Sequence, residues 1–267
     1  MRRPFGAIAV VGLFVVVVPL AAHDTWLLPS SMRVPVGRQV TLSLTSGMAF
    51  PVDDFAIAAK RVTRANVRLA GATTNLATPA PSTLSLRYRW TPSATGIAAI
   101  ALELAPKSLV LAPEKIEEYF LDINASKSLR AAWDSIPSPK QWRESYSKHA
   151  SSFVRVGEPV GDSSWHAPLG MGFELLPEDN PTELRAGQTV HVRALRGGSP
   201  VANLEVGFQF ENETNVSFAT TDANGRASMK LSKDGRWLIH STNLRRTRKP
   251  NLEWESDFAT MTVAVRR

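Results

Sequence analysis

The sequence predicts a mainly β protein with two β-sandwich modules, immunoglobulin-like or transthyretin-like, joined by a helical insert. Residues 23–105 and 175–267 alternate polar with apolar residues, the period of two that marks half-buried strands. Turn-forming residues punctuate both regions at short intervals. Helical spacing appears only between them, within residues 106–174, and a leader segment, residues 1–22, precedes the first module.

The first module contains three clear strand segments. Residues 39–44 and 85–90 alternate polar with apolar, and a turn-forming run at 91–96 leads into a continuous apolar strand at 97–104. Residues 70–82 are rich in Ala, Thr and Pro, so we expect a mobile loop there.

The insert begins with a helix signal. Pro113 takes an early helical position, acidic residues follow it, and apolar residues recur at Ile116, Tyr119 and Phe120 with helical spacing. A second helix is predicted over residues 140–150, after two prolines at 137 and 139 interrupt the first helical region.

The second module repeats the strand and turn pattern. Residues 189–195, 204–210, 236–242 and 258–265 are predicted strands. Residues 219–227 predict a strand, a tight turn and a strand. In this turn Asp222 and Asn224 bond nearby backbone amides and Gly225 takes a positive φ.

Residues 1–22 have the composition of a cleaved export signal. Arg2 and Arg3 form a basic start, residues 7–20 form an apolar run, and Ala21 and Ala22 are the small residues that a signal peptidase accepts. Cleavage after Ala22 predicts a periplasmic protein that starts at His23, with no stable membrane span left. A retained anchor is the alternative, because residues 5–22 approach the length of a bilayer span.

Composition excludes several function classes. The chain has no cysteine, which removes disulfides, thiolate metal sites and cysteine nucleophiles. The formal net charge is +7, but the densest basic run, residues 245–249, lies in no nucleic-acid-binding module, so we expect no nucleic-acid partner. Nucleophile-elbow, phosphate-loop and metalloenzyme motifs are missing from the sequence, so we do not expect an enzyme.

The predicted metal ligands are His23 and His240. An N-terminal His23 offers its α-amine and its imidazole, a compact chelate for nickel, cobalt or copper. His240, on the predicted strand 236–242, is the expected second ligand, with a plain surface or edge position as the alternative. The other histidines, at 149, 166 and 191, lie in no ligand motif. A row of acids at 253, 255 and 257 could bind a cation, but such a row more often keeps a sheet edge soluble.

Five segments in chain order resemble the bacterial DUF4198 family, which has also been labelled a NikM-like, periplasmic component of cobalt and nickel uptake. The segments are His-Asp-Thr-Trp-Leu at 23–27, Glu-Ser-Tyr-Ser-Lys at 144–148 running into Val-Arg-Val-Gly at 154–157, Leu-Arg-Ala-Gly at 184–187, Thr-Asp-Ala-Asn-Gly-Arg-Ala at 221–227, and Trp-Glu-Ser-Asp-Phe at 254–258. The resemblance covers essentially the whole mature chain. In the family pattern a histidine often stands where this chain has Asn243.

The resemblance implies a periplasmic protein that binds a transition-metal ion or metal complex, with an inner-membrane metal-uptake transporter as its partner. A rival hypothesis is a non-enzymatic envelope module that recognises a protein or glycan, with His23 incidental. A copper oxidase built on an N-terminal histidine is a third, and it requires a second histidine held near the first. Metal analysis of the mature protein separates the first two of these hypotheses.

Overall fold

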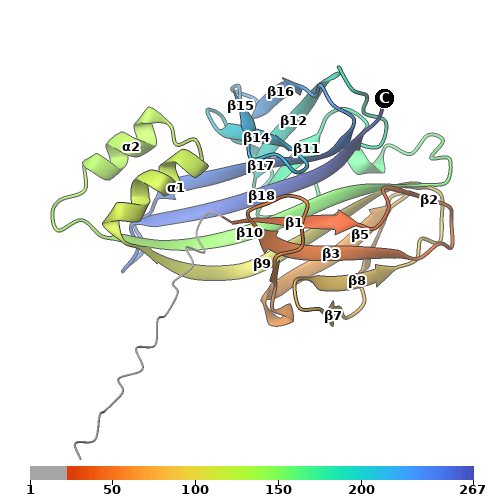
Figure 1. Ribbon diagram of the computed structural model, residues 1–267, viewed down its shortest axis with the longest axis horizontal. Coiled ribbons are helices and arrows are strands. Elements are labelled where there is room, and N and C mark those ends of the chain that lie inside the picture. Colours follow the sequence, from red (N-terminus) through yellow and green to blue (C-terminus); the bar gives the residue numbers. More distant parts are fainter. Residues whose placement is uncertain (1–22) are drawn as a thin grey trace, which may run out of the picture.

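A central nine-stranded sheet runs through the protein and carries a smaller sheet on each of its faces (Figure 1). The computed structural model describes residues 23–267, so the predicted leader, 1–22, lies outside the described residues. The predicted mainly β class is confirmed. Neither α-helix in the described part of the chain has the length and apolar character needed to cross a lipid bilayer.

The central sheet contains strands from both predicted modules and from the predicted insert. Its strand order is β15 (Val216–Thr220), β14 (Glu205–Phe210), β17 (Gly235–Arg246), β18 (Trp254–Val265), β10 (Trp142–Val156), β9 (Gly96–Leu111), β5 (Val62–Leu69) and β6 (Ala72–Asn75), with β2 (Arg33–Val34) also paired to β10. Strands β10 and β18 run parallel and join the two halves. The two regions therefore share one continuous sheet.

The first smaller sheet covers one face of the central sheet. Its order is β1 (Asp24–Pro29), β3 (Val40–Gly47), β8 (Leu86–Trp90) and β7 (Ala80–Pro81), and β4 (Phe55–Ala56) pairs with β3. The predicted strands at 39–44 and 85–90 are confirmed. The predicted mobile loop at 70–82 is wrong, because β6 and β7 both form there. A tight turn with positive φ at Ala70 and Gly71 returns β6 onto β5.

The second smaller sheet covers the opposite face. It is built from β11 (Phe173–Pro177), β12 (Thr189–Arg196), β13 (Ser199–Pro200) and β16 (Arg226–Lys230). The predicted turn between β15 and β16 is present, with Gly225 at φ +73° and the Asp222 carboxylate accepting from the amides of Asn224 and Arg226 at 2.8 and 2.9 Å. This turn carries the chain from the central sheet to the smaller one.

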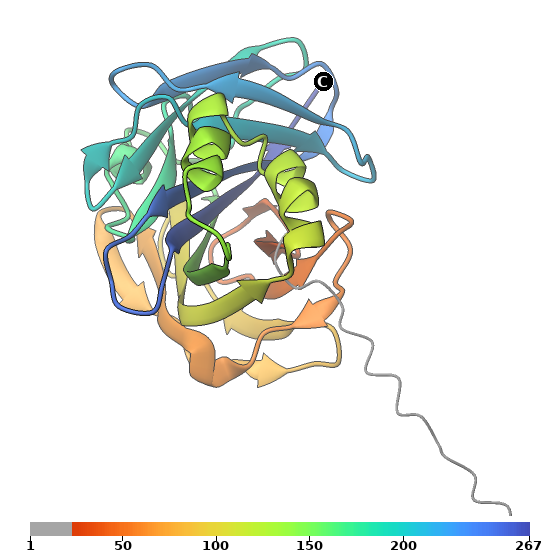
Figure 2. The ribbon, with the colours of Figure 1, turned by 90° about the vertical axis from the view of Figure 1, so that its left-hand side faces the viewer.

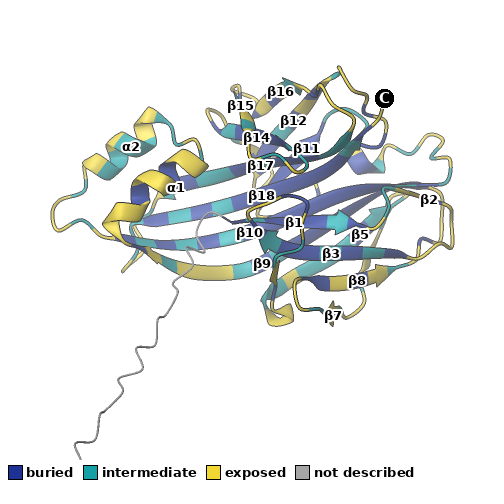
Figure 3. Ribbon diagram, in the orientation of Figure 1, coloured by how far each residue is buried: buried dark blue, intermediate teal, exposed yellow. Residues whose placement is uncertain are grey.

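The position of strand β9 explains why residues 97–102 are apolar without alternation. Ala98, Ile100 and Leu102 pack into the core under the first smaller sheet, whereas Ala99 and Ala101 pack into the core under the second. Because both faces of β9 are buried, both sets of alternate residues are apolar. Figure 3 shows the middle of β9, β10 and β18 buried and the outer helices largely exposed.

The predicted second helix, at 140–150, is wrong. These residues belong to β10, which pairs with β9 on one side and β18 on the other. Trp142, Glu144, Tyr146 and Lys148 alternate onto one buried face, so the true period is two. The buried Glu144 and Lys148 hid this period, because charged side chains at core positions break the apolar pattern.

Two short helices cover one end of the long strands (Figure 2). The predicted first helix is confirmed as η2 (Pro113–Lys115) followed by α1 (Ile116–Asp122), and α2 (Lys127–Asp134) begins after the Ser126 cap. Further short 3-10 turns are η1 (Ala59–Arg61) and η3 (Ser164–His166). Tyr119 and Phe120 of α1 pack against Trp142, which stacks on Trp254 at 4.7 Å between ring centroids.

Candidate functional site

The start of the described chain is fixed over the central sheet. Strand β1 is the edge of its own sheet, and its free carbonyl groups face side chains of β10 and β18. Thr260 Oγ1 donates to the carbonyl oxygen of Thr25 at 2.6 Å, and Lys148 Nζ donates to that of His23. These bonds hold the first residues in one position across the two halves of the fold.

His23 is buried, with 3% of its surface exposed. Its ring stacks on Phe55 with centroids 5.2 Å apart and planes 9° apart. Burial lowers the pKa of His23 from its ordinary 6.5, the Lys148 charge lowers it further, and Asp54 and Asp24 act in the opposite direction. Atom Nδ1 of His23 is buried and has no hydrogen-bond partner within residues 23–267. The imidazole is therefore neutral near pH 7 and has a free nitrogen.

Lys148 places a buried amino group beside His23. Its Nζ lies 5.8 and 5.5 Å from the ring centroids of Tyr146 and Phe258. Burial lowers the pKa of Lys148 to about 8, although the carboxylate of Asp24 favours the charged form. No local pattern predicts this buried amine, because lysine is almost never fully buried unless it is paired.

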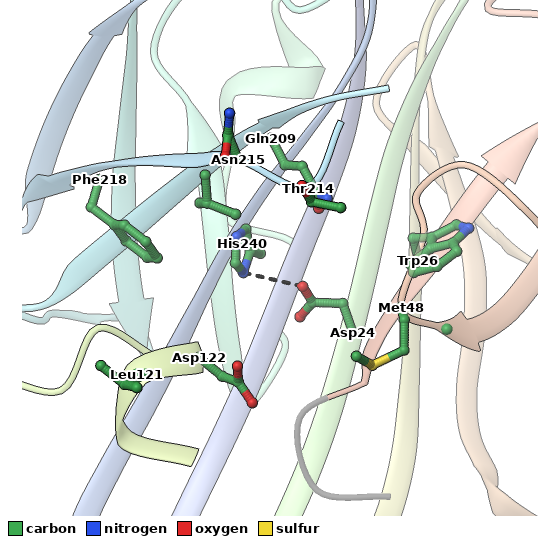
Figure 4. A pocket seen from close by; sticks show the side chains of 12 residues that line it. Asp24, Trp26, Met48, Leu121, Asp122, Gln209, Thr214, Asn215, Phe218 and His240 are labelled. Carbon is green, nitrogen blue, oxygen red and sulfur yellow. Dashed lines mark ion pairs between the residues drawn. The ribbon is translucent and has the colours of Figure 1, made fainter. Parts of the chain in front are cut away.

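A cavity of about 410 Å³ opens next to β1, and Figure 4 shows the side chains that line it. In the cavity Asp24 Oδ2 lies 3.2 Å from Nδ1 of His240, which comes from β17. The remaining lining comes from β1, β3 and the residues after it, the end of α1, and β14 with β15 and the loop between them. The lining residues are Asp24, Trp26, Gly47, Met48, Leu121, Asp122, Gln209, Thr214, Asn215, Val216, Phe218 and His240.

The structure places His240 next to Asp24, the residue that follows His23. His240 lines the cavity, whereas His23 does not. Successive side chains on a strand point to opposite faces, so His23 and Asp24 diverge. Atom Nε2 of His240 is buried against Gly207, where a Cβ would overlap it, and has no hydrogen-bond partner in the described chain. The His240 side chain is only 12% exposed, so His240 is not a surface histidine.

Asp122, at the end of α1, is a cavity residue that the sequence did not indicate. Burial raises its pKa, and the like charges of Glu118 and Asp24 raise it further. The proximity of Asp122 to Asp24 depends on how α1 packs on the long strands, and no local sequence pattern predicts that packing. Within residues 23–267, no three His, Cys, Asp or Glu side chains are grouped so that they could hold a metal ion.

The remaining histidines make separate contacts. His149 Nδ1 lies 3.1 Å from Glu103 and its Nε2 3.7 Å from Asp257, whereas His191 pairs with Asp179 at 3.0 Å. His166 lies beside the ring of Trp165, at 5.1 Å between centroids.

The acidic row at 253, 255 and 257 is paired with basic side chains. Glu253, Glu255 and Asp257 contact Arg143, Lys249 and Arg245 at 2.5, 2.6 and 2.7 Å. The interpretation of this row as a soluble sheet edge is wrong, because β18 lies between β10 and β17.

The family model described as "Domain of unknown function (DUF4198)" matches residues 20–244. The chain belongs to the DUF4198 family. Among curated proteins, none matches this DUF4198 chain.

Solved structures resemble the DUF4198 chain only weakly. The mouse nectin-like molecule 4 ectodomain has 9% identity and a TM-score of 0.22, covering 91% of this chain and 64% of that one. Salmonella alpha-2-macroglobulin reacted with methylamine has 12% identity and a TM-score of 0.27, covering 92% and 15%. A putative membrane anchored protein from Corynebacterium diphtheriae has 11% identity and a TM-score of 0.22, covering 91% and 53%. The chain spans less than two thirds of the length of each.

Proposed function

We propose that this DUF4198 protein is exported, is cleaved before His23, and binds a divalent nickel, cobalt or copper ion through His23. The observation that carries the proposal is the buried, unpartnered Nδ1 of His23. A free α-amine and Nδ1 of one histidine close a six-membered ring with a metal ion, so Nδ1 is the nitrogen that an N-terminal chelate requires. An unsatisfied buried nitrogen costs about 1–3 kcal/mol, and a bound metal would remove that cost.

The surroundings of His23 supply further support. Metal ligation requires neutral imidazole, and burial lowers the pKa of His23. The 3.2 Å between Asp24 Oδ2 and His240 Nδ1 matches two ligands on one metal ion, since bonds of about 2.0–2.2 Å at tetrahedral or octahedral angles separate ligand atoms by about 3 Å. Asp24 follows His23 in the chain, but its side chain points to the opposite face of the strand, so the Asp24–His240 pair is a secondary part of the proposal.

Calorimetry with NiCl₂ and with CuSO₄ tests the site, using mature protein that starts at His23. One added alanine before His23 converts the α-amine into an amide and leaves every side chain in place. We expect this addition and His23→Ala each to weaken binding at least tenfold, and His240→Ala to weaken it less. His191→Ala, at an exposed histidine paired with Asp179, is the matched control. Equal affinity with and without the added alanine would eliminate the chelate.

We further propose that the bound metal is passed to an inner-membrane uptake transporter. The support for this step is the family's association with cobalt and nickel uptake. Deletion of the gene should lower cellular nickel or cobalt measured by mass spectrometry, and N-terminal sequencing of periplasmic protein should give His23. A protein that binds no metal in any form would favour the envelope interaction module.

A further inference from the structure

The cavity beside β1 has the size and lining of an organic ligand site. Its volume of about 410 Å³ lies within the range of about 300–1,000 Å³ found for small-molecule pockets. A bare metal ion needs several ligand atoms within about 2.6 Å, whereas much of this wall is apolar. The apolar wall residues are Trp26, Met48, Leu121, Val216 and Phe218.

The charge of the cavity selects the kind of ligand. Asp24 and Asp122 both lie on the cavity side in Figure 4, one from β1 and one from the end of α1. The charges that most raise the pKa of Asp122 are the like charges of Glu118 and Asp24. Two carboxylates that face one cavity repel an anion and attract a cation. Among the described residues that line this cavity, His240 is the only one with a basic side chain.

The remaining walls suit an organic cation better than a hydrated ion. Phe218 lines the cavity, and its ring lies 6.1 Å from that of His240, which pairs with Asp24. The face of an aromatic ring attracts an organic cation. Met48 and Leu121 are 66% and 65% exposed and form an apolar mouth. Gln209 is buried, and its Nε2 is held by the carbonyl of Glu213 at 2.7 Å, which fixes one polar group of the wall.

We propose that this cavity binds a small organic cation, with its ammonium or guanidinium group between Asp24 and Asp122 and its apolar body against Phe218, Leu121 and Met48. His23 does not line the cavity, but Asp24 and His240, the further metal ligands of the proposed function, do, so cation binding is tested in the absence of a metal ion.

Calorimetry in the presence of EDTA tests this site without a metal ion. The probes are phenethylammonium, hexylammonium and agmatine, with 2-phenylethanol and 3-phenylpropionate as the neutral and anionic counterparts of the first. We expect at least one cation to bind, and its affinity to exceed that of the neutral and anionic probes at least tenfold. No binding by any of the three cations, or equal binding of phenethylammonium and 2-phenylethanol, would overturn the proposal.

Two substitutions locate the bound cation. Asp122→Asn removes one carboxylate of the cavity and should weaken binding at least fivefold without lowering the thermal midpoint. Asp134→Asn, on the exposed end of α2, is the matched control and should leave affinity unchanged. Equal affinity of the Asp122→Asn variant and the parent would overturn the assignment. Binding that appears only after EDTA is replaced by nickel would also overturn it and would favour the metal site.

Discussion

Glu144→Gln tests the buried carboxylate that fastens α1 to the central sheet. Glu144 is fully buried, and its Oε1 accepts from Tyr119 at 3.1 Å and from Ser256, while its Oε2 accepts from Trp142 Nε1 at 2.8 Å. Glutamine keeps one oxygen for the Trp142 N–H, so its NH₂ group faces the hydroxyls of Tyr119 and Ser256, whose protons lose their acceptor. Each buried polar group left without a partner costs about 1–3 kcal/mol, and loss of the buried charge offsets part of this.

We therefore expect Glu144→Gln to lower the free energy of unfolding by about 1–3 kcal/mol at pH 7, measured by urea denaturation. Tyr119→Phe removes only one donor and should cost about 0.5–1.5 kcal/mol. In a double-mutant cycle, Tyr119→Phe should cost less in the glutamine background, because it removes a hydroxyl whose proton the new NH₂ group opposes. A glutamine variant as stable as the parent would refute the three-donor arrangement.

The pH dependence provides a second readout for Glu144. Burial raises its pKa, and its hydrogen bonds to Ser256, Trp142 and Tyr119 act in the opposite direction. A raised carboxyl pKa means that the folded state holds its proton more tightly than the unfolded state. The stabilisation that protonated Glu144 gives the folded state is fully present below the unfolded pKa of about 4.3, and it is lost as pH rises through the pKa of Glu144 in the folded state. The glutamine variant should lack this slope.

Three further predictions concern other parts of the fold. Gly225→Ala should cost about 1–3 kcal/mol, because the position has φ +73° and a Cβ there would lie 2.6 Å from the carbonyl oxygen of Ala194; an unchanged thermal midpoint would contradict this. Burial opposes a charge on His149, but Asp257 and Glu103 outweigh this effect and raise the pKa of His149 above 6.5. The stabilisation that protonated His149 gives the folded state is therefore complete below pH 6.5 and is lost as pH rises through the folded pKa. Urea titrations across pH 6–9 should show a smaller decline for His149→Gln than for the parent. Lys148→Met should tighten nickel binding severalfold, because it removes the cation beside His23; weaker binding by a folded variant would count against the proposed chelate.

The sequence alone determined the β class and most of the strands, because alternation is a local property that half-buried strands impose. It also located the first helix and the turn at Asp222, since proline, acidic and glycine positions have local causes. It did not identify β10 as a strand. The partners of β10 are β9 and β18, and Glu144, for example, pairs with Leu109 and Trp254. Long-range pairing of this kind decides which charged residues are buried, and no short window contains it.

The same distinction between local sequence and tertiary structure applies to the candidate site. His23 and His240 are predicted as ligands from the sequence, because a cleavage pattern and the chemistry of histidine depend only on single residues and their neighbours. Only the tertiary structure placed His240 against Asp24, buried Lys148 beside His23, and brought Asp122 to the same cavity as Asp24. These residues come from β1, β10, β17 and α1, which meet because β1 packs across the central sheet and α1 covers its end. Burial and charge at such a junction depend on packing between distant segments, so they are set by the fold as a whole.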